Sequence, residues 1–266
     1  FRNLYKHKTQ NIISIIGLAV GLLCFCVCIY CSRFVESTDH CFTNHDRIAE
    51  LNLYDGKTDR YFSGSPVPLA EDLRTWSLGE TEAISSVTYP RERPYYVELS
   101  PEKMLPYELE TIEIDTCYNK IFTPEMVAGH WKMASQSLNS VILSQSMAIK
   151  IFGNAESAIG KHMTLMRRLN TSPESTPKTG GIVYTIQAVM KDIPLNNSLD
   201  FMQNIDMLTV NDSEGLLQSS KRHNMTGANT YVLLSPQTTC TDLEKQFSKR
   251  DYTYTLYGEA YTVTAS

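Results

Sequence analysis

The sequence predicts an α+β domain outside the cytoplasm, held in the membrane by one N-terminal helix. Three observations support this fold class. No charged residue lies between Lys8 and Arg33. Several later segments place apolar side chains at alternate positions, which is typical of half-buried strands. Residues 141–153 have the pattern of a strand, a helix cap, a helix and a glycine stop, so strand and helix are mixed along the chain.

The membrane helix is predicted over residues 11–32, after a basic cytoplasmic segment over residues 1–10 and before an exported domain over residues 33–266. The apolar stretch Ile12–Cys31 is about twenty residues long, and at about 1.5 Å per residue it matches the ~30 Å core of a bilayer. A cleaved signal peptide is the alternative, but its apolar core is only ~7–15 residues long and small residues mark its cleavage site. Arg33 follows the stretch closely here, so we expect a retained anchor.

Charge sets the expected orientation of this helix. Arg2, Lys6 and Lys8 precede the apolar stretch without any acidic residue, whereas acidic residues join Arg33 after it. The positive-inside rule therefore places the N-terminus in the cytoplasm. The chain has a net charge of −5, and without its three N-terminal cations the exported part carries −8. Such an acidic domain is a poor match for nucleic acid phosphates, so we expect no nucleic-acid partner.

The exported domain is expected to begin with a helical continuation over residues 36–46. A first strand is predicted over residues 47–54, because its apolar side chains alternate. Asp55-Gly56 is a typical hairpin turn, and the chain is expected to return through a strand at residues 61–62.

A helix is predicted next, with Ser65 as its N-cap and Pro66 in its first turn. Its apolar face recurs at helical spacing, at Leu69, Leu73 and Trp76. Three strands follow, over residues 83–89, 95–99 and 109–117. The turns around them are expected at Pro90, Pro94, Pro101 and Pro106.

The clearest unit of the chain comes next, because four independent signals agree. Val141–Leu143 is a short apolar strand, Ser144 is a helix N-cap and Gly153 is a helix stop. Between them an apolar helical face is formed by Met147, Ala148, Ile151 and Phe152. A strand–helix unit is therefore predicted here.

The last part of the chain alternates between loops and strands. Residues 170–181 hold two prolines and no periodicity, which predicts an exposed loop. Thr241 and Glu244 have the spacing of a capping box, which predicts a final helix with Leu243 and Phe247 on its buried face. Strands are expected over residues 182–190, 201–208 and 230–234.

No arrangement typical of an enzyme or a cofactor site occurs in the sequence. The run at residues 153–162 has six residues between its glycines, where a phosphate loop needs four, and lacks Ser or Thr after its lysine. Ser175 and Lys178 match Ser-x-x-Lys, but within the expected loop and not at a helix start. Five residues of types that bind zinc follow the apolar stretch: Asp39, His40, Cys41, His45 and Asp46. A zinc site also needs a second Cys/His pair from another segment, and the sequence has none. We therefore expect no catalysis, no cofactor and no metal.

Small residues in the membrane stretch predict helix packing. Gly17 and Gly21 have the small-xxx-small spacing that lets two membrane helices approach closely. The cysteines of the stretch are expected to pack as small apolar groups: Cys24, Cys26, Cys28 and Cys31. The three others, Cys41, Cys117 and Cys240, allow at most one internal disulfide.

The order of these features resembles the N-terminal half of a bacterial ABC-transporter permease of the MacB/FtsX type. The resemblance covers nearly the whole chain and is most specific in the block Val141–Leu165, with its strand, helix and Phe-Gly turn. The other matching segments are FRNLYKHK, Asn11-Ile12, Gly17–Gly21, Phe42, Asp46-Arg47-Ile48 and Tyr184–Pro194.

The resemblance implies a periplasmic core domain with a porter-like lobe and a strand-rich lobe, the latter placed roughly over residues 78–132. It implies a permease dimer in the bacterial inner membrane, in contact with membrane lipid and driven by a separate cytoplasmic ABC ATPase subunit. A periplasmic or outer-membrane protein is a further expected partner. The first membrane helix would pass movement to the periplasmic domain for efflux or export. Such permeases carry further spans after this domain, so the 266 residues are expected to belong to a longer chain or to be a remnant.

Two other functional classes stay open. An extracytoplasmic binding or sensor protein on a single anchor would need a ligand pocket. A type II membrane enzyme would expose its sequons to glycosylation in a eukaryotic lumen, at Asn170, Asn196, Asn211 and Asn224.

Overall fold

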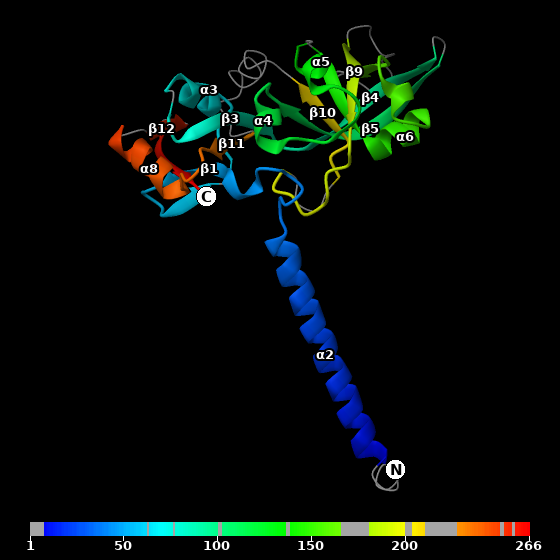
Figure 1. Ribbon diagram of the computed structural model, residues 1–266, viewed down its shortest axis with the longest axis vertical. Coiled ribbons are helices and arrows are strands. Elements are labelled where there is room, and N and C mark those ends of the chain that lie inside the picture. Colours follow the sequence, from blue (N-terminus) through cyan, green and yellow to red (C-terminus); the bar gives the residue numbers. More distant parts are fainter. Residues whose placement is uncertain are drawn as a thin grey trace, which may run out of the picture. The chain divides into compact units, whose positions relative to one another are not determined.

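The structure is a computed structural model of the 266-residue chain, which divides into two compact units, Phe1–His40 and Cys41–Ser266. Figure 1 shows the long helix of the first unit and the mixed helices and strands of the second. The residues described are 8–62, 64–76, 78–100, 103–136, 139–165, 181–199, 204–210, 228–250, 253–256 and 259–266.

The first unit is built on helix α2 (Lys8–Glu36). A window of 18 residues within Ile12–Glu36 has a mean hydropathy of 2.9, so by length and composition this helix can cross a membrane. The helical continuation expected over residues 36–46 is wrong, because turns follow α2 directly. Asp39 has a φ of 63°, a left-handed conformation that a right-handed helix cannot contain.

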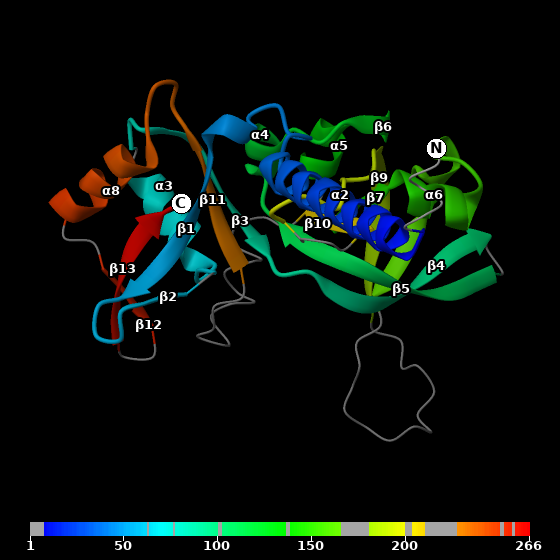
Figure 2. The ribbon, with the colours of Figure 1, turned by 90° about the horizontal axis from the view of Figure 1, so that it is seen from below.

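Six strands of the second unit close into a ring, which we call the barrel lobe (Figure 2). Around the ring they are β4 (Arg91–Ser100), β5 (Lys103–Ile114), β10 (Met207–Val210), β7 (Ser140–Ser144), β9 (Ile182–Met190) and β8 (His162–Leu165). The ring closes because β10 pairs with β7 on one side and with β5 on the other. The β5–β10 and β7–β9 pairs are parallel and the others antiparallel.

Alternate side chains of these strands fill the barrel lobe, as the period of two along a strand requires. They include Tyr95, Val97, Leu109, Val141, Leu143, Met163, Tyr184, Ile186 and Met207. Helix α6 (Gln145–Phe152) and the 3₁₀ helix η2 (Glu156–Ala158) pack against the same core. The alternation predicted for residues 182–190 is confirmed as far as Gln187. Ala188, Val189 and Met190 are all buried, with Val189 in this core and Ala188 and Met190 in a separate one.

Six further strands form an open sheet, which we call the sheet lobe. Its order is β3 (Thr81–Thr88), β11 (Ala228–Leu234), β1 (Ile48–Asp55), β13 (Glu259–Ala265) and β12 (Thr253–Leu256), with β2 (Arg60–Phe62) on β1. Helices α3 (Pro68–Thr75) and α8 (Cys240–Lys249) share one apolar core with these strands, in which Leu69, Leu73, Leu243 and Phe247 are buried. The C-terminal residues thus complete this sheet.

A third core joins the two lobes. It combines β3 and β11 of the sheet lobe with β5, β7, β9 and β10 of the barrel lobe, around helix α4 (Tyr118–Phe122). In the sheet itself only one pair of residues, Val87 and Ile114, links β3 to β5 in the described part of the chain. The expected strand-rich lobe over residues 78–132 is wrong in its bounds, because β3 lies in the sheet lobe and the barrel lobe also uses strands as far as Val210.

Strand β6 (Met126–Gly129) and helix α5 (Trp131–Gln136) complete the structure beside β9. Gly129 has a φ of 70°, and a Cβ there would lie 2.3 Å from the carbonyl oxygen of Gln187. The close pairing of β6 with β9 therefore requires glycine at this position.

The strand–helix unit predicted at residues 141–153 is confirmed. Ser144 caps α6 by accepting a hydrogen bond from the backbone nitrogen of Met147 at 3.4 Å. Gly153 ends the helix with a φ of 87°, which costs glycine nothing. The loop predicted over residues 170–181 and the start of the strand predicted over residues 201–208 lie mostly outside the described residues.

The predicted start of the first short helix is wrong. Helix α3 opens with Pro68 and has Val67 at its N-cap, so neither Ser65 nor Pro66 begins it. Ser65 instead bridges to Ala228 of β11. Its buried hydroxyl lies 2.6 Å from that of Thr230, and this pairing removes Ser65 from the helix.

Two of the prolines expected in turns lie inside strands. Pro94 is in β4 and Pro106 is in β5, where they oppose Glu108 and Tyr96. Proline lacks an N–H donor and is tolerated in a strand only where no neighbour needs that donor. Around Pro106, the described part of β5 pairs with β4 alone, because its pairing with β10 begins only at Thr111.

The capping box of α8 is made by Thr239 and Asp242, not by the expected Thr241 and Glu244. Both pairs have the spacing of three residues that a capping box needs. The packing of Leu243 and Phe247 against the sheet lobe decides where the helix begins.

Asp242 makes the stability of this cap depend on pH. Hydrogen bonds from Lys245 and Thr239 lower the pKa of Asp242 to about 2. Because the ordinary pKa of Asp is about 3.9, the carboxylate stabilises the folded domain above pH 4 and loses this effect as the pH falls towards 2. We expect Asp242→Asn to lower the Tm by a few degrees at pH 7 and by less below pH 4, in thermal unfolding followed by circular dichroism.

The matched control for this prediction is Thr241→Ala. Thr241 belongs to the alternative capping-box pair, which α8 does not use, so its replacement removes no cap. We expect it to leave the Tm unchanged. An effect of Asp242→Asn that is the same at pH 7 and pH 3 would contradict the prediction.

Candidate functional site

The second unit begins with a short segment that is anchored into its core. We call residues 42–47 the attachment segment; it ends in the 3₁₀ helix η1 (His45–Arg47). Phe42 is only 3% exposed and lies in the core that joins the two lobes. Its ring meets that of Phe122 edge to face, with 5.0 Å between centroids. A buried aromatic pair of this kind fixes the start of the unit.

Two further residues of the attachment segment bind the C-terminal end of α4. The Asn44 side-chain nitrogen donates to the carbonyl oxygen of Lys120 at 3.3 Å, and the Thr43 backbone nitrogen donates to the Thr123 hydroxyl at 3.3 Å. The last carbonyl groups of a helix have no partner within it, so outside donors stabilise them. Thr123 itself ends α4 in a left-handed conformation.

Arg47 ties the same segment to the sheet lobe. Its guanidinium donates to the Glu82 carboxylate at 2.9 Å and to the carbonyl oxygen of Leu234 at 2.8 Å. It also donates to the side-chain oxygen of Asn44 at 3.3 Å. The attachment segment is therefore fixed to β3, to β11 and to α4.

Helix α4 sits inside an aromatic cluster. The rings of Tyr118 and Phe122 stack at 4.8 Å, and Tyr118 also stacks on Trp131 at 6.0 Å. Phe122 meets Tyr231 of β11 edge to face at 5.0 Å. This five-residue helix therefore holds its place through buried side chains from both lobes.

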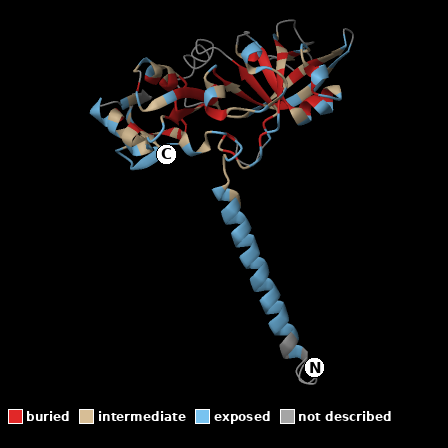
Figure 3. Ribbon diagram, viewed as in Figure 1, coloured by how far each residue is buried: buried red, intermediate tan, exposed pale blue. Residues whose placement is uncertain are grey.

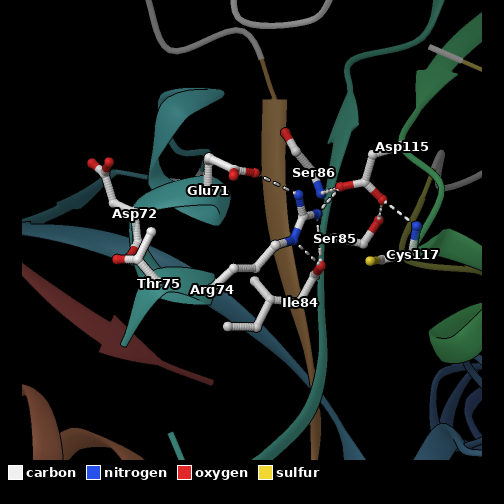
Figure 4. A network of polar contacts seen from close by, with 9 residues as sticks. All are labelled: Glu71, Asp72, Arg74, Thr75, Ile84, Ser85, Ser86, Asp115 and Cys117. Carbon is white, nitrogen blue, oxygen red and sulfur yellow. Dashed lines mark hydrogen bonds and ion pairs between the residues drawn. The ribbon is translucent and has the colours of Figure 1, made fainter. Parts of the chain in front are cut away.

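At the other end of α4 lies a buried polar network, which we call the joint network (Figure 4). Its centre is the ion pair of Arg74, from α3, with Asp115, which stands between β5 and α4. The Asp115 side chain is 2% exposed. Arg74 also donates to the carbonyl oxygen of Ile84 at 2.8 and 3.0 Å and to the Glu71 carboxylate at 3.0 Å.

The Asp115 carboxylate accepts three further hydrogen bonds. They come from the Ser85 hydroxyl at 2.8 Å, the Ser86 backbone nitrogen at 3.0 Å and the Cys117 backbone nitrogen at 2.9 Å. A buried carboxylate is stable only when it is paired and hydrogen-bonded in this way. The network thus joins α3, β3 and the start of α4 at the point where β3 and β5 meet.

Burial and charge act together on the groups of the joint network. Burial is the largest single influence on Arg74 and lowers its pKa, but the charges of Asp115 and Cys117 and the hydrogen bonds to Asp115 and Glu71 together outweigh it, so the pKa of Arg74 is raised. Burial raises the pKa of the Cys117 thiol, and the nearby charge of Arg74 offsets this only in part. At neutral pH Arg74 is charged and Cys117 is a neutral thiol.

A groove of about 510 Å³ lies beside the attachment segment. Its walls are residues 41–43, 123–125 and 191–194. Lys191 and Glu125 form an exposed ion pair at 3.0 Å on its rim. Among the described residues, no group of three His, Cys, Asp or Glu side chains is placed to hold a metal ion.

The predicted packing residues Gly17 and Gly21 lie on a continuous face of α2. With Cys24, Cys28 and Cys31 they follow one another at alternating steps of four and three, the spacing of a helix-packing seam. A Cβ built at either glycine would meet nothing within 4 Å. We call this face the small-residue seam; it has room for the backbone of a second helix.

Sequence reasoning missed the joint network. The sequence gives Arg74 no role, and residue 115 falls only within the strand predicted over residues 109–117. The only available signal was an acidic residue directly after a buried strand, which is too common to single out. Phe42 and Arg47 belong to segments that resemble the family, but the sequence assigns no role to either residue.

The chain thus combines one apolar helix with a closed barrel and an open sheet that share a core. The family described as the MacB-like periplasmic core domain matches residues 12–250. The chain belongs to this family, as the resemblance in its sequence predicts. No curated protein sequence matches the chain.

Solved structures agree with this fold. A domain of a protein assigned as a permease from Porphyromonas gingivalis is 20% identical, with a TM-score of 0.62 over 85% of this chain and 92% of that one. The extracellular domain of the noncanonic ABC-type transporter YknZ from Gram-positive bacteria is 12% identical, with a TM-score of 0.50 over 82% and 99%. The periplasmic region of MacB from Actinobacillus actinomycetemcomitans is 14% identical, with a TM-score of 0.49 over 81% and 86%.

Proposed function

We propose that this chain is the N-terminal part of the permease subunit of a MacB/FtsX-type ABC transporter in a bacterial inner membrane. Its N-terminus lies in the cytoplasm, where a separate ATPase hydrolyses ATP. The membrane helix carries the resulting movement to the periplasmic domain, which uses it for efflux or export. The chain itself performs no catalysis.

The attachment segment is the observation that carries this proposal. A helix can move a domain efficiently only if the segment that connects them is attached to the domain by side-chain contacts. The covalent connection of the backbone alone would let the two move independently. Phe42 supplies a buried anchor, and Arg47 and Asn44 add charged and amide hydrogen bonds to three elements. A passive tether needs no such anchoring.

The shared core supports the same function. Since residues of both lobes and of α4 are buried in it, the barrel lobe and the sheet lobe are expected to move together when the attachment segment is pulled. A domain of this kind passes on displacement with little loss.

A direct test is to purify the native protein from its own membranes in mild detergent and to identify what accompanies it. The proposal expects an ATPase with a phosphate loop. A chain that is isolated alone contradicts the transporter function and favours a single-anchor binding protein.

The anchoring role of Phe42 makes a second prediction. In the complex with the ATPase, a fluorescent probe at Met104→Cys, which is on the exposed β4–β5 hairpin, should report movement on ATP addition. We expect Phe42→Ala to reduce this signal at least about tenfold, which corresponds to about 1.4 kcal/mol of coupling. Phe247→Ala is the matched control, because it empties a buried aromatic site of the sheet lobe away from the attachment segment. An equal loss in both variants would contradict the assignment.

A further inference from the structure

We propose that α4 is the coupling element of the periplasmic domain, so that a change at the attachment segment alters the joint network at its opposite end. This inference rests on the proposed function and names the element through which movement would reach the two lobes.

The two ends of α4 are held by different parts of the structure. At its C-terminal end, Asn44 donates to the carbonyl oxygen of Lys120, and Thr43 pairs with Thr123 through both its backbone nitrogen and its hydroxyl. At its N-terminal end, the backbone nitrogen of Cys117 donates to Asp115 at 2.9 Å. Only the five residues of α4 separate these two groups of contacts.

Helix α4 is also packed so closely that one end cannot be displaced without moving the other. Tyr118, Ile121 and Phe122 have no exposed surface, and the two rings stack on each other. Phe122 contacts Phe42 of the attachment segment, while Tyr118 lies next to Cys117 in the chain. In a close-packed core, a shift of one side chain must be taken up by its neighbours. A displacement of Phe42 or Asn44 is therefore passed along α4 towards Asp115.

The joint network is placed to respond to such a shift. Asp115 holds Arg74 of α3 and the edge of β3 at Ser85 and Ser86, where the described residues form a single β3–β5 pair. Its geometry therefore sets how the barrel lobe and the sheet lobe meet. Coupling through α4 would connect the entry point of force with that junction.

Cys117 provides a natural reporter of the joint network. It is half-buried beside Arg74, and burial raises the pKa of its thiol. Alkylation is therefore slow while the contacts of the joint network are intact. Cys240 is a matched internal reference, because it is also half-buried with a raised thiol pKa but begins α8 in the sheet lobe. The rates of the two thiols separate a local change from general loosening.

The test uses the full chain in detergent with the other five cysteines replaced by alanine, and N-ethylmaleimide as the probe. We expect Asn44→Ala to raise the labelling rate of Cys117 at least about fivefold, the lower end of typical coupling between sites, and to leave the rate of Cys240 unchanged. Asn52→Ala is the matched control, since it removes an exposed amide hydrogen bond to Ser266 and none to α4. It should change neither rate.

Two results would overturn the proposal. An unchanged Cys117 rate in Asn44→Ala would show that the two ends of α4 are independent. Equal acceleration of Cys117 and Cys240 would show general loosening in place of coupling. Since no ATPase is present in this assay, its failure leaves the proposed transport function standing, and the absence of an ATPase partner would leave the labelling result unchanged.

Discussion

Asp115→Ala is expected to destabilise the exported domain by about 3–5 kcal/mol, because it leaves the charge of Arg74 partly buried without its partner. The same change removes the acceptor of three hydrogen bonds, from Ser85, Ser86 and Cys117. A buried donor without an acceptor costs about 1–3 kcal/mol. Unfolding in urea, followed by the fluorescence of Trp76 and Trp131, measures the loss.

Two further variants separate charge from hydrogen bonding in this prediction. Asp115→Asn keeps an acceptor and removes the charge, so we expect a smaller loss than with alanine. Arg74→Met combined with Asp115→Leu removes both charges and should recover part of the stability, as replacement of a whole buried ion pair often does.

The control is the exposed pair of Lys191 and Glu125, where Glu125→Ala should cost less than about 1 kcal/mol. If Asp115→Ala and Glu125→Ala cost the same, the joint network does not stabilise the junction of the two lobes.

Self-association of the membrane helix gives the second large effect. If the permease is a dimer packed through the small-residue seam, replacing both Gly17 and Gly21 with isoleucine puts branched side chains where the backbones meet. We expect the dimer to be lost in detergent while the exported domain stays folded, as measured by light scattering and circular dichroism.

The membrane cysteines give this prediction its own positional control. Cys28 lies in the small-residue seam, whereas Cys26 lies about 200° away around the helix at about 100° per residue. The test uses chains in which either Cys28 or Cys26 is the only cysteine of the helix. Oxidation should cross-link two copies through Cys28 and not through Cys26. The Gly17→Ile, Gly21→Ile variant should abolish the Cys28 product. Equal cross-linking through both positions would contradict a seam.

Much of the fold could be predicted from the sequence, because its signals are local. The gap in charge between Lys8 and Arg33 predicts α2, and Ser144 and Gly153 bracket α6 as expected. Local signals failed where two nearby residue pairs fitted the same sequence pattern equally well. Thr241 has the same spacing to Glu244 as Thr239 has to Asp242, and only the packing of α8 on the sheet lobe selects the second.

The candidate site could be predicted in part only. Phe42 and Arg47 belonged to segments that resemble the family, so the place of the attachment segment could be anticipated. Its contacts could not, because Arg47 binds Leu234, which is 187 residues later in the chain. The spacing of Gly17 and Gly21 is a local property of one helix, so it can be found in the sequence, and their role in helix packing stays a prediction.

The sequence by itself determined one N-terminal helix long and apolar enough to cross a membrane, the mixture of helices and strands, and the family. Hydropathy, periodicity and capping act between residues a few positions apart, so they can be read along the chain. Only the tertiary structure decided that β5 and β10 close a barrel, that one core joins both lobes, and that Arg74 meets Asp115. Arg74 and Asp115 are 41 positions apart and the paired residues of β5 and β10 are 96 apart, and the free energy of each contact depends on burial by all the others.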